Sequence, residues 1–454
     1  MQNVLFIFFS TLLCFTVGAE PIRLSHRPPA EQAPDFELTR LAFGSCCKQG
    51  QPAPVLSLIA SRRPDLYLWL GDNVYADTID MDKMREAYAT LRNKPEYRKL
   101  MLATPVIGVW DDHDYGANDA GVNYPKKKES RAIALDWFDI PANAERRQNP
   151  GIYGAHELGP QEKRVQVILL DLRTWRTAQK SRKDKIYPNM GRYVADSSDE
   201  ASMLGEEQWS WLEAQLRKPA RLRLIGMSTQ FAASDNGFET WANYPKEQQR
   251  FLDLIRKTRA EGVLFLSGDT HYAELDLMEE EGLYPLYDLT ASAINQTWDP
   301  PGPSTNRIFP AYPHPNYGWV EVEWGKADPE VQLKIFDAND ATQIEFEFPL
   351  SRLTFEERNL KPSVPDDAFQ GSWKSRFGTM EFVRGEGDSW SAVYEKGRCD
   401  LSRQGRSLRG TWTEGDRTGK VSFTLTRDGK FLTGAYGRGD GPTLLAWSAW
   451  KESD

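Results

Sequence analysis

Apolar runs of strand length alternate with amphipathic helical stretches between residue 36 and about residue 300. The runs predicted as strands are short and apolar: LTRLAFGS, LYLWLG, VIGVW, VQVILLDL, LRLIGMS and GVLFLSG. The stretches predicted as helices show apolar positions at helical spacing: KESRAIALDWFD, GEEQWSWLEAQLRK and YPKEQQRFLDLIRKTRAEG. This alternation is typical of a layered α/β architecture.

The hydrophobic period changes to two from YPLYDLTAS onward. YGWVEVEW, VQLKIFD and QIEFEFPL alternate apolar and polar residues, which predicts half-buried antiparallel strands that complete a first domain over residues 36–352. Prolines and charged residues then predict a linker over residues 353–365. Residues 366–454 show short strand patterns separated by glycines, which predicts a small all-β domain, a sandwich or a barrel.

The first residues of the chain form an apolar run that ends with Val17 and Ala19 in the spacing that signal peptidase prefers. We therefore expect a signal peptide over residues 1–19 and a periplasmic or secreted protein, with a retained N-terminal anchor as the alternative. No later stretch is long and apolar enough to span a bilayer, so we expect no transmembrane span after signal cleavage.

The net charge excludes some classes of partner, and the number of cysteines limits how they can pair. A net charge of -9 argues against a nucleic acid or an anionic membrane as partner, because both require a basic surface. Without the leader, Cys46, Cys47 and Cys399 remain, an odd number in an oxidising compartment. Cys47 is then either buried or paired with Cys399, and Cys46 is free for another role. No feature of the sequence indicates an oligomeric state.

Polar residues follow the predicted strands at the same position each time. LWLGDNVYADTID passes from an apolar strand directly to Asp72 and Asn73. LAFGSCC, VIGVWDDHD and GVLFLSGDTH end in Cys46, in a run of acids with His113, and in Asp269 with a nearby histidine. Each ending alone has an ordinary explanation as a turn or a helix cap. Together they predict a site, because strand ends form the ligand crevice of layered α/β folds.

Converging carboxylates would repel one another and would not stay ionised unless cations neutralised them. A mixed set of Asp, Asn and His suits a centre of two metal ions that share one carboxylate, and a thiolate from Cys46 shifts the preference of one ion toward iron or zinc. No serine-hydrolase elbow, P-loop or zincin helix occurs in the chain.

The strand-end motifs resemble a known family. FGSC, LWLGDNVYAD, VWDDHD, LLDLRTWR, WANYP and SGDTHYAEL, in this order, are similar to the alkaline phosphatase D (PhoD-like) branch of the calcineurin-like metallophosphoesterases over about residues 36–350. The resemblance implies a four-layer fold of two β-sheets flanked by helices. It also implies two or more metal ions and hydrolysis of small phosphate monoesters or diesters by attack of metal-bound hydroxide.

The resemblance assigns a role to individual residues. Asp72 resembles the ligand that bridges two metal ions, and Asp112 stands where the wider superfamily has the Asn of its GNH motif. His113 resembles the residue that stabilises the transferring phosphoryl group or protonates the leaving oxygen. Asp269 and His271 resemble the ligands of a GDxH motif.

The metal type follows from the same resemblance. Cys46 matches the cysteine that binds ferric iron in this branch, which implies iron together with calcium, with zinc or manganese as alternatives. Lys48 stands where the pattern often has tyrosine, so a phenolate ligand is either missing or supplied elsewhere. Asn73 and Asn118 are further candidate ligands. Arg173 is a candidate to bind a phosphate oxygen, with an ion pair as its alternative role.

A different class of function is a catalytically inactive phosphatase fold that serves as an envelope or carbohydrate-binding protein. The converging carboxylates argue against it, because an inactive relative has no physical reason to keep unpaired carboxylates at one edge. Metal content distinguishes the two classes. The long segment WDPPGPSTNRIFPAYPHPNYG, rich in proline and aromatic residues, is predicted either as a lid over the site or as a packed surface connection.

Overall fold

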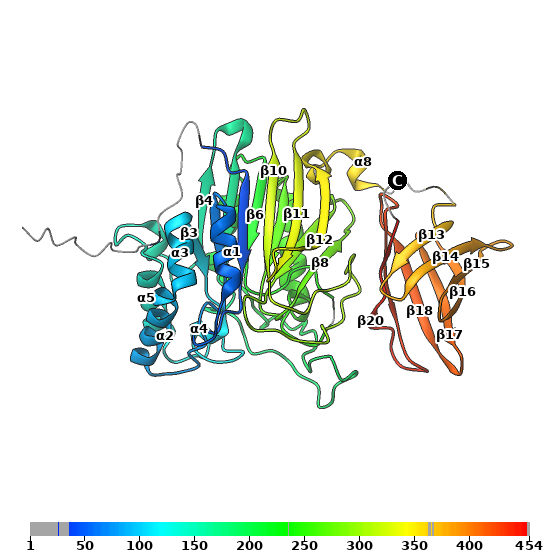
Figure 1. The fold of residues 1–454 in the computed structure, drawn as a ribbon, viewed down its shortest axis with the longest axis horizontal. Coiled ribbons are helices and arrows are strands. Elements are labelled where there is room, and N and C mark those ends of the chain that lie inside the picture. Colours follow the sequence, from blue (N-terminus) through cyan, green and yellow to red (C-terminus); the bar gives the residue numbers. More distant parts are fainter. Residues whose placement is uncertain (1–25, 27–35, 235, 362–364, 366, 452–454) are drawn as a thin grey trace, which may run out of the picture.

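The structure is a computed structural model, and it describes residue 26 and residues 36–234, 236–361, 365 and 367–451. Figure 1 shows a large body of helices and sheets with an all-β unit at one side. The predicted signal peptide, residues 1–19, lies outside the described residues. Among the helices that are described, none combines the length and the apolar character needed to cross a membrane.

The first sheet combines parallel and antiparallel strands in the order β12-β11-β10-β1-β2-β3. Neighbouring strands from β1 to β3 run parallel, whereas β10 to β12 form an antiparallel meander. The meander strands are those with the predicted period of two. The strands are β1 (Arg40–Gly44), β2 (Leu66–Leu70), β3 (Val106–Val109), β10 (Asn316–Glu323), β11 (Glu330–Asp337) and β12 (Thr342–Pro349).

The second sheet has the order β4-β5-β6-β7-β9-β8. Its strands β5, β6 and β7 are parallel and buried along their whole length, as continuous apolar runs predict. The strands are β4 (Gly154–Leu158), β5 (Val165–Leu169), β6 (Leu222–Gly226), β7 (Val263–Ser267), β8 (Ala273–Met278) and β9 (Leu286–Ala291).

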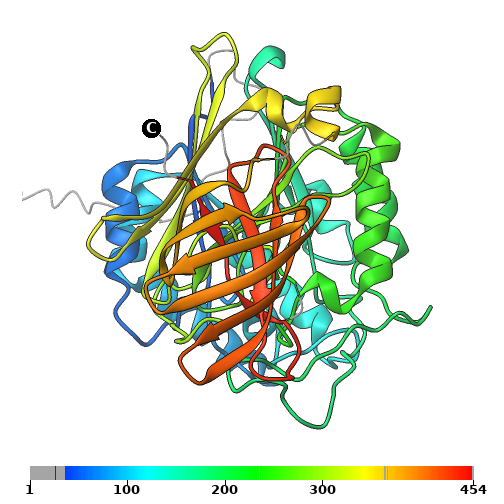
Figure 2. The same ribbon diagram turned by 90° about the vertical axis from the view of Figure 1, so that its right-hand side faces the viewer.

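Helices cover the outer face of each sheet, and Figure 2 shows the blue and cyan helices on one side and the green helices on the other. The main helices are α1 (Pro54–Arg62), α2 (Met81–Asn93), α3 (Pro95–Ala103), α5 (Lys127–Trp137), α6 (Gly205–Leu216) and α7 (Pro245–Thr258). Short helical turns are α4 (Asp112–Tyr115), α8 (Glu357–Leu360), η1 (Glu145–Arg147), η2 (Gln161–Lys163), η3 (Trp241–Asn243) and η4 (Leu350–Leu353). The predicted four-layer fold is confirmed.

The C-terminal unit is a closed barrel. Its strands pair in the order β18-β17-β16-β15-β14-β13-β21-β19-β20, and an additional pairing of β18 with β19 closes the sheet. Tryptophans fill its interior, with Trp373 and Trp447 almost fully buried. The strands are β13 (Gly371–Ser375), β14 (Gly378–Arg384), β15 (Ser389–Tyr394), β16 (Gly397–Gln404), β17 (Ser407–Glu414), β18 (Arg417–Leu425), β19 (Phe431–Tyr436), β20 (Leu445–Ala446) and β21 (Ala449–Trp450).

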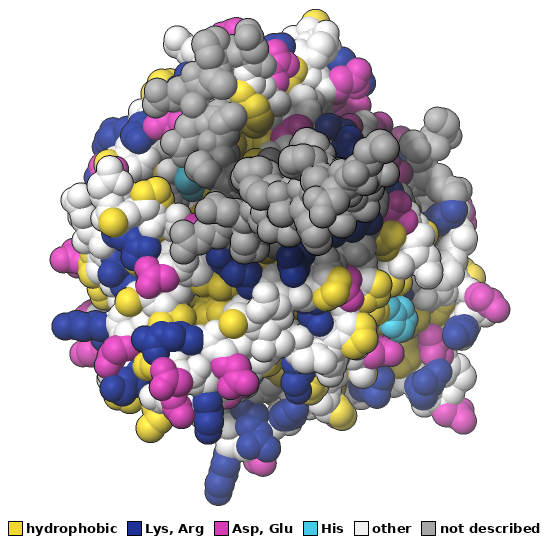
Figure 3. All heavy atoms as spheres, turned by 60° about the vertical axis from the view of Figure 1, so that its left-hand side comes forward, with side chains coloured by type: hydrophobic (Ala, Val, Ile, Leu, Met, Phe, Trp, Pro, Cys, Tyr) yellow, Lys and Arg dark blue, Asp and Glu magenta, His cyan; other side chains and the backbone are white. Residues whose placement is uncertain are grey.

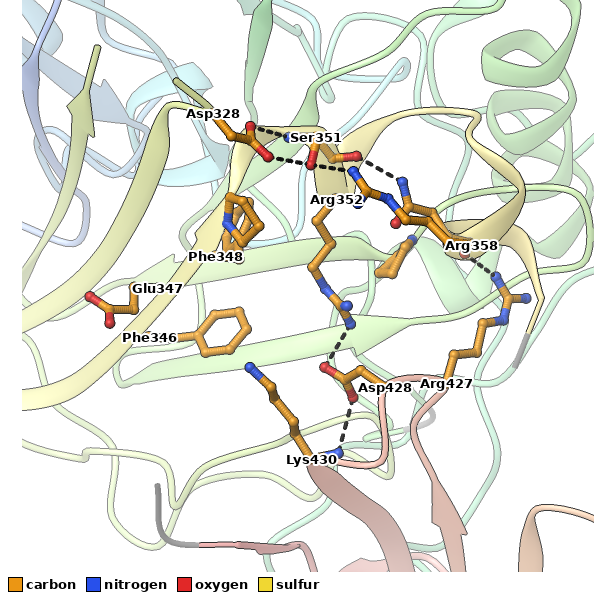
Figure 4. Close-up of a pocket in the computed structure, with 13 residues that line it drawn as sticks. Asp328, Phe346, Glu347, Phe348, Ser351, Arg352, Arg358, Arg427, Asp428 and Lys430 are labelled. Atoms are coloured by element: carbon orange, nitrogen blue, oxygen red, sulfur yellow. Dashed lines mark hydrogen bonds and ion pairs between the residues drawn. The ribbon is translucent and has the colours of Figure 1, made fainter. Parts of the chain in front are cut away.

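The barrel contacts the two-sheet body through the loop between β18 and β19, which Figure 4 shows beside a cavity of about 330 Å³. Arg352 of η4 forms an ion pair with Asp428 of that loop at 2.8 Å. The guanidinium of Arg427 donates to the carbonyl oxygens of Leu283 at 2.6 Å and Glu280 at 2.8 Å. These bonds tie the barrel to the segment that joins β8 and β9.

The three described cysteines are buried and free. Cys47 packs in the core of the two-sheet body, and Cys399 lies on β16 inside the barrel. Of the two alternatives for Cys47, burial is therefore correct and pairing with Cys399 is not.

Surface charge is mixed in sign. On the face drawn in Figure 3, Lys and Arg side chains lie interspersed with Asp and Glu side chains.

Candidate metal centre

The predicted polar strand ends meet at one edge of the two sheets, where α4 follows β3 (Figure 1). The residues involved follow β1, β2, β3 and β7, and they are Cys46, Asp72, Asp112, Asp269 and His271. Parallel strands place their carboxyl ends side by side, so residues far apart in sequence come together here.

Several groups of potential ligand atoms lie within 4.8 Å of one another. One group joins Cys46, Asp72 and His271, and a second joins Asp72 to Asp112 and His113. A third joins Asp72, Asp111, Asp112 and Asp269. Asp72 belongs to each of these three groups, which makes it the candidate to be shared by two metal ions, whereas a fourth group joins Asp112, Asp119 and Glu239.

The backbone at these residues is strained. Cys46, Asp72, Asp269 and His271 have φ angles of 59°, 50°, 71° and 62°, in the left-handed region that L-residues avoid. Each such residue costs on the order of 1 kcal/mol, and such residues concentrate at functional sites. Gly71 precedes Asp72 at φ 93°, and a Cβ there would lie 2.4 Å from Cβ of Asp111. Only glycine permits this close approach of the two strand ends.

The site carries buried oxygens without hydrogen-bond partners among the described residues. They are Oδ1 of Asp72, Oδ1 of Asn73 and Oδ2 of Asp111. Buried carboxylate and amide oxygens of this kind cost free energy unless a donor or a cation satisfies them. Oxygen-rich sites with one nitrogen or sulfur donor suit divalent and trivalent metal ions. The residues present therefore fit a metal centre.

Without metal, the carboxyl groups cannot all ionise. Burial and the neighbouring Cys46 and Asp112 raise the pKa of Asp72 well above its ordinary value. Burial, with the nearby charge of Asp111, does the same to the pKa of Asp269. Burial would also raise the pKa of Asp112, but the charges of Arg173 and His113 and a hydrogen bond from the backbone of Asp119 together lower it to about 2. A bound cation would reverse the upward shifts.

Tyr75 is a member of the site that the sequence motifs did not identify. Its hydroxyl donates to Oδ2 of Asp72 at 3.0 Å and lies 3.0 Å from Nε2 of His271. Cys46 Sγ lies 3.6 Å from the same Asp72 oxygen. A phenol from the loop after β2 therefore lies among the candidate ligands, although Lys48 stands where the family pattern often has tyrosine. Its only sequence signal is its position three residues after Asp72 in GDNVY.

His113 lies at the solvent side of the cluster, and its Nδ1 is 2.8 Å from each carboxylate oxygen of Asp77. Burial by itself would lower the pKa of His113, but the hydrogen bond to Asp77 and the charge of Asp112 raise it overall. With Nδ1 bound to Asp77, Nε2 is the nitrogen left for a substrate. Asp77 was not among the candidate site residues of the sequence.

Arg173 contacts carboxylates rather than the open site. Its side chain is 0% exposed, with ion pairs to Asp111 at 2.5 Å and Glu239 at 2.6 Å. Glu239 also binds Arg176. The interactions of Arg173 are those of the ion-pair alternative, and Arg173 is not among the residues that line the cavity.

The two candidate asparagines differ in position. Asn73 is buried, and its amide nitrogen donates to Asp114 Oδ2 at 2.5 Å, which leaves its unpartnered oxygen within the loop after β2. Asn118 is exposed, and its backbone N–H donates to Asp77 at 3.1 Å. Asn118 borders the cavity above the cluster but belongs to none of its tight ligand groups.

A cavity of about 290 Å³ opens above the acidic cluster. Its floor includes Asp112, Glu239, Asp269 and His271, and Trp298 is part of its wall. Trp298 begins the proline-rich segment after β9, so at least this end of the segment borders the site.

Comparison with known proteins is consistent with this geometry. The sequence model of the PhoD-like phosphatase family matches residues 41–306. The curated alkaline phosphatase D of Bacillus subtilis (strain 168) is 23% identical over 297 residues, which are 57% of this chain and 50% of that protein. The match therefore spans half the length of this relative.

A solved structure of PhoD is similar in fold. It has 16% sequence identity and a TM-score of 0.52, and the alignment covers 92% of this chain and 74% of that chain.

Proposed function

This chain belongs to the PhoD-like phosphatase family, and from that membership we propose that it is a metal-dependent phosphoesterase that hydrolyses small phosphate monoesters or diesters. The observation that carries the proposal is the set of buried carboxylates around Asp72, whose unpartnered oxygens fit metal ions. Bound metal ions would supply two effects, activation of a water molecule near neutral pH and neutralisation of charge on the phosphate oxygens.

The proposed ligands divide between two positions that share Asp72. Cys46, Tyr75 and His271 surround one position. The carboxylates of Asp111, Asp112 and Asp269 would surround the other, with Asn73, whose Oδ1 is buried without a partner among the described residues, as a further candidate. The sulfur and phenol donors favour iron at the first position, and the oxygen set favours calcium at the second, with zinc or manganese as alternatives.

The residues outside the ligand set hold or move protons and charges. His113, whose pKa the hydrogen bond to Asp77 raises against the effect of burial, would donate from Nε2 to the leaving oxygen or bind the phosphoryl group. Arg173 would position Asp111 and Glu239 through its buried ion pairs. Export to the periplasm or the medium is proposed from residues 1–19 of the sequence.

The test is release of p-nitrophenol from its phosphate monoester and from the bis-p-nitrophenyl diester, with added metals, by the wild-type chain and by Asp72→Ala. We expect turnover by the wild type and a loss of at least about a thousandfold in the variant, because the shared ligand is removed. Retention of turnover by a folded Asp72→Ala variant would refute the assignment.

A further inference from the structure

The cavity above the acidic cluster is lined by two chemically different sets of residues. Its lining includes the carboxylates and histidines already described, and it also includes the aromatic residues Tyr193, Phe238 and Trp298. Each ring comes from a different loop: the segment between β5 and α6, the segment between β6 and α7, and the segment between β9 and β10. Three separate loops therefore place aromatic rings beside a strongly polar site.

Trp298 is unusual in its exposure. Its residue is 46% exposed, and it is the aromatic member of the small set of large hydrophobic residues that are exposed in the described part of the chain. Its ring lies 6.0 Å from that of Phe238 in an edge-to-face arrangement. Its backbone N–H donates to the carbonyl oxygen of His271 at 2.9 Å. The backbone of Trp298 is thus bonded to that of a proposed metal ligand, and its exposed ring contacts Phe238.

Tyr193 is fixed in a similar way. Residues 180–194 form a hairpin, in which Ser181 pairs with Tyr193. The Tyr193 hydroxyl donates to Asp119 Oδ2 at 2.5 Å, and its backbone N–H donates to the carbonyl oxygen of Gly237 at 2.7 Å. The hairpin and the loop that carries Phe238 are therefore bonded together, so these two rings belong to one wall.

The dimensions of the cavity limit what can bind there. At about 290 Å³ it lies near the lower end of small-molecule sites, which leaves room for a phosphoryl group and one ring. A planar ring that stacks on a protein aromatic side chain gains roughly 5- to 150-fold in binding. The apolar surface of an exposed tryptophan stays in contact with water, which is unfavourable, unless such a ring covers it.

We propose that Trp298, Phe238 and Tyr193 form a stacking subsite that selects phosphate esters whose alcohol carries a planar aromatic ring. The inference rests on the proposed phosphoesterase function, and it adds the substrate class. The ester phosphorus would lie over the acidic cluster, and the ring of the alcohol would lie against Trp298. An ester with a saturated ring of the same size would fill the cavity without stacking.

The test compares benzyl phosphate with cyclohexylmethyl phosphate. Both are monoesters of primary alcohols with a six-membered carbon ring, and they differ in aromaticity. For the metal-loaded wild type we expect kcat/KM to be about tenfold higher for the benzyl ester. Trp298→Ala should lower the benzyl value about tenfold and the cyclohexylmethyl value about twofold, so that the preference largely disappears. Trp298→Phe should keep most of the preference, because a ring remains.

A matched control is Trp211→Ala. Trp211 is a half-buried tryptophan on α6 that does not line the cavity. We expect this variant to keep the wild-type preference for the benzyl ester. If Trp298→Ala lowers kcat/KM for both esters by the same factor, the ring affects the whole site equally and the stacking subsite is refuted.

Binding of phosphonates separates this inference from the proposed function. Benzylphosphonate and cyclohexylmethylphosphonate lack the cleavable ester bond, so calorimetry on the metal-loaded chain measures their binding without turnover. Tighter binding of benzylphosphonate that depends on Trp298 supports the subsite even if neither ester is hydrolysed. Hydrolysis of both esters at equal rates, with equal phosphonate affinities, refutes the subsite and leaves the phosphoesterase proposal intact. Equal affinities without hydrolysis contradict both.

Discussion

At the scale of single residues, the centre combines strained backbone with carboxyl groups whose negative charges repel one another. Asp72 has a φ of 50°, one partner-free buried oxygen and a pKa raised by burial and by its neighbours. Such a group lowers the stability of the metal-free chain, because folding requires it to take up a proton that the unfolded chain releases at neutral pH. We therefore expect Asp72 to lower the free energy of unfolding of the metal-free chain while it increases the affinity for metal.

Asp72→Asn tests this expectation in the metal-free chain. Asparagine tolerates the left-handed backbone and carries no charge, so we expect unfolding at pH 7 to require more free energy, on the order of 1 kcal/mol. The gain should shrink as the pH falls toward 3.8, the ordinary pKa of Asp, where the unfolded wild-type carboxyl also becomes protonated. Urea unfolding at pH 7 and pH 4 measures both quantities. A variant less stable than wild type at pH 7 would contradict this account.

Arg173 gives a second prediction at this scale. Replacing it by Met leaves Asp111 and Glu239 buried without their cation, and breaking a buried pair costs about 3–5 kcal/mol. We expect a large fall in the free energy of unfolding, with part of the stability restored by Arg173→Lys. The control is Arg250→Met, whose ion pair with Glu206 is exposed and contributes about 1 kcal/mol or less. Equal losses of unfolding free energy in the two Met variants would show that the buried ion pairs contribute no more stability than an exposed one.

Sequence reasoning at the residue scale found the candidate site residues that directly follow strands but not those that lie farther into loops. Asp72 and Asp269 follow apolar strands immediately, which made their common location predictable. Tyr75 and Asp77 reach the site through the path of the loop after β2, which no periodicity encodes. Asp80, which follows in the same sequence, instead caps α2 by accepting from the backbone N–H of Asp82 at 3.0 Å.

At the scale of elements, strands with one clear hydrophobic period were predicted well and mixed segments were not. β8 was missed because Glu274 and Asp276 are polar yet fully buried, and they find partners in Arg307 and Ser304. α1 and α3 each begin with a proline and are short, so their amphipathic pattern is brief. Tertiary partners, which a single sequence does not display, decide these elements.

The hairpin 180–194 links the barrel to the site, and it yields a prediction at this scale. Tyr187 donates from its hydroxyl to the carbonyl oxygen of Pro442 at 2.5 Å. In Tyr187→Phe we expect faster amide hydrogen exchange across residues 180–194 by roughly fivefold, because one hydrogen bond of about 1 kcal/mol is lost. Exchange in α7 serves as the internal reference. Unchanged exchange in the hairpin would show that the barrel does not restrain this wall of the cavity.

At the scale of the whole molecule, two sheets place their strand ends at one edge, and the closed barrel attaches to the side of the body. The layered fold could be predicted because alternating strand and helix patterns admit few architectures. Closure of the C-terminal sheet could not be predicted, since it depends on the pairing of β18 with β19 rather than on any strand alone. The candidate ligands from both sheets meet only because the sheets face each other.

The central claim is that this edge of the sheets binds the metal ions on which hydrolysis depends. The most direct measurement strips the chain with a chelator, restores metal in steps, and records bound metal and turnover of both p-nitrophenyl esters in the same samples. The account predicts that turnover starts near zero and saturates at about two bound ions per chain, while Asp72→Ala stays inactive. Full turnover by the stripped chain, or metal binding without any turnover of either p-nitrophenyl ester, would contradict it.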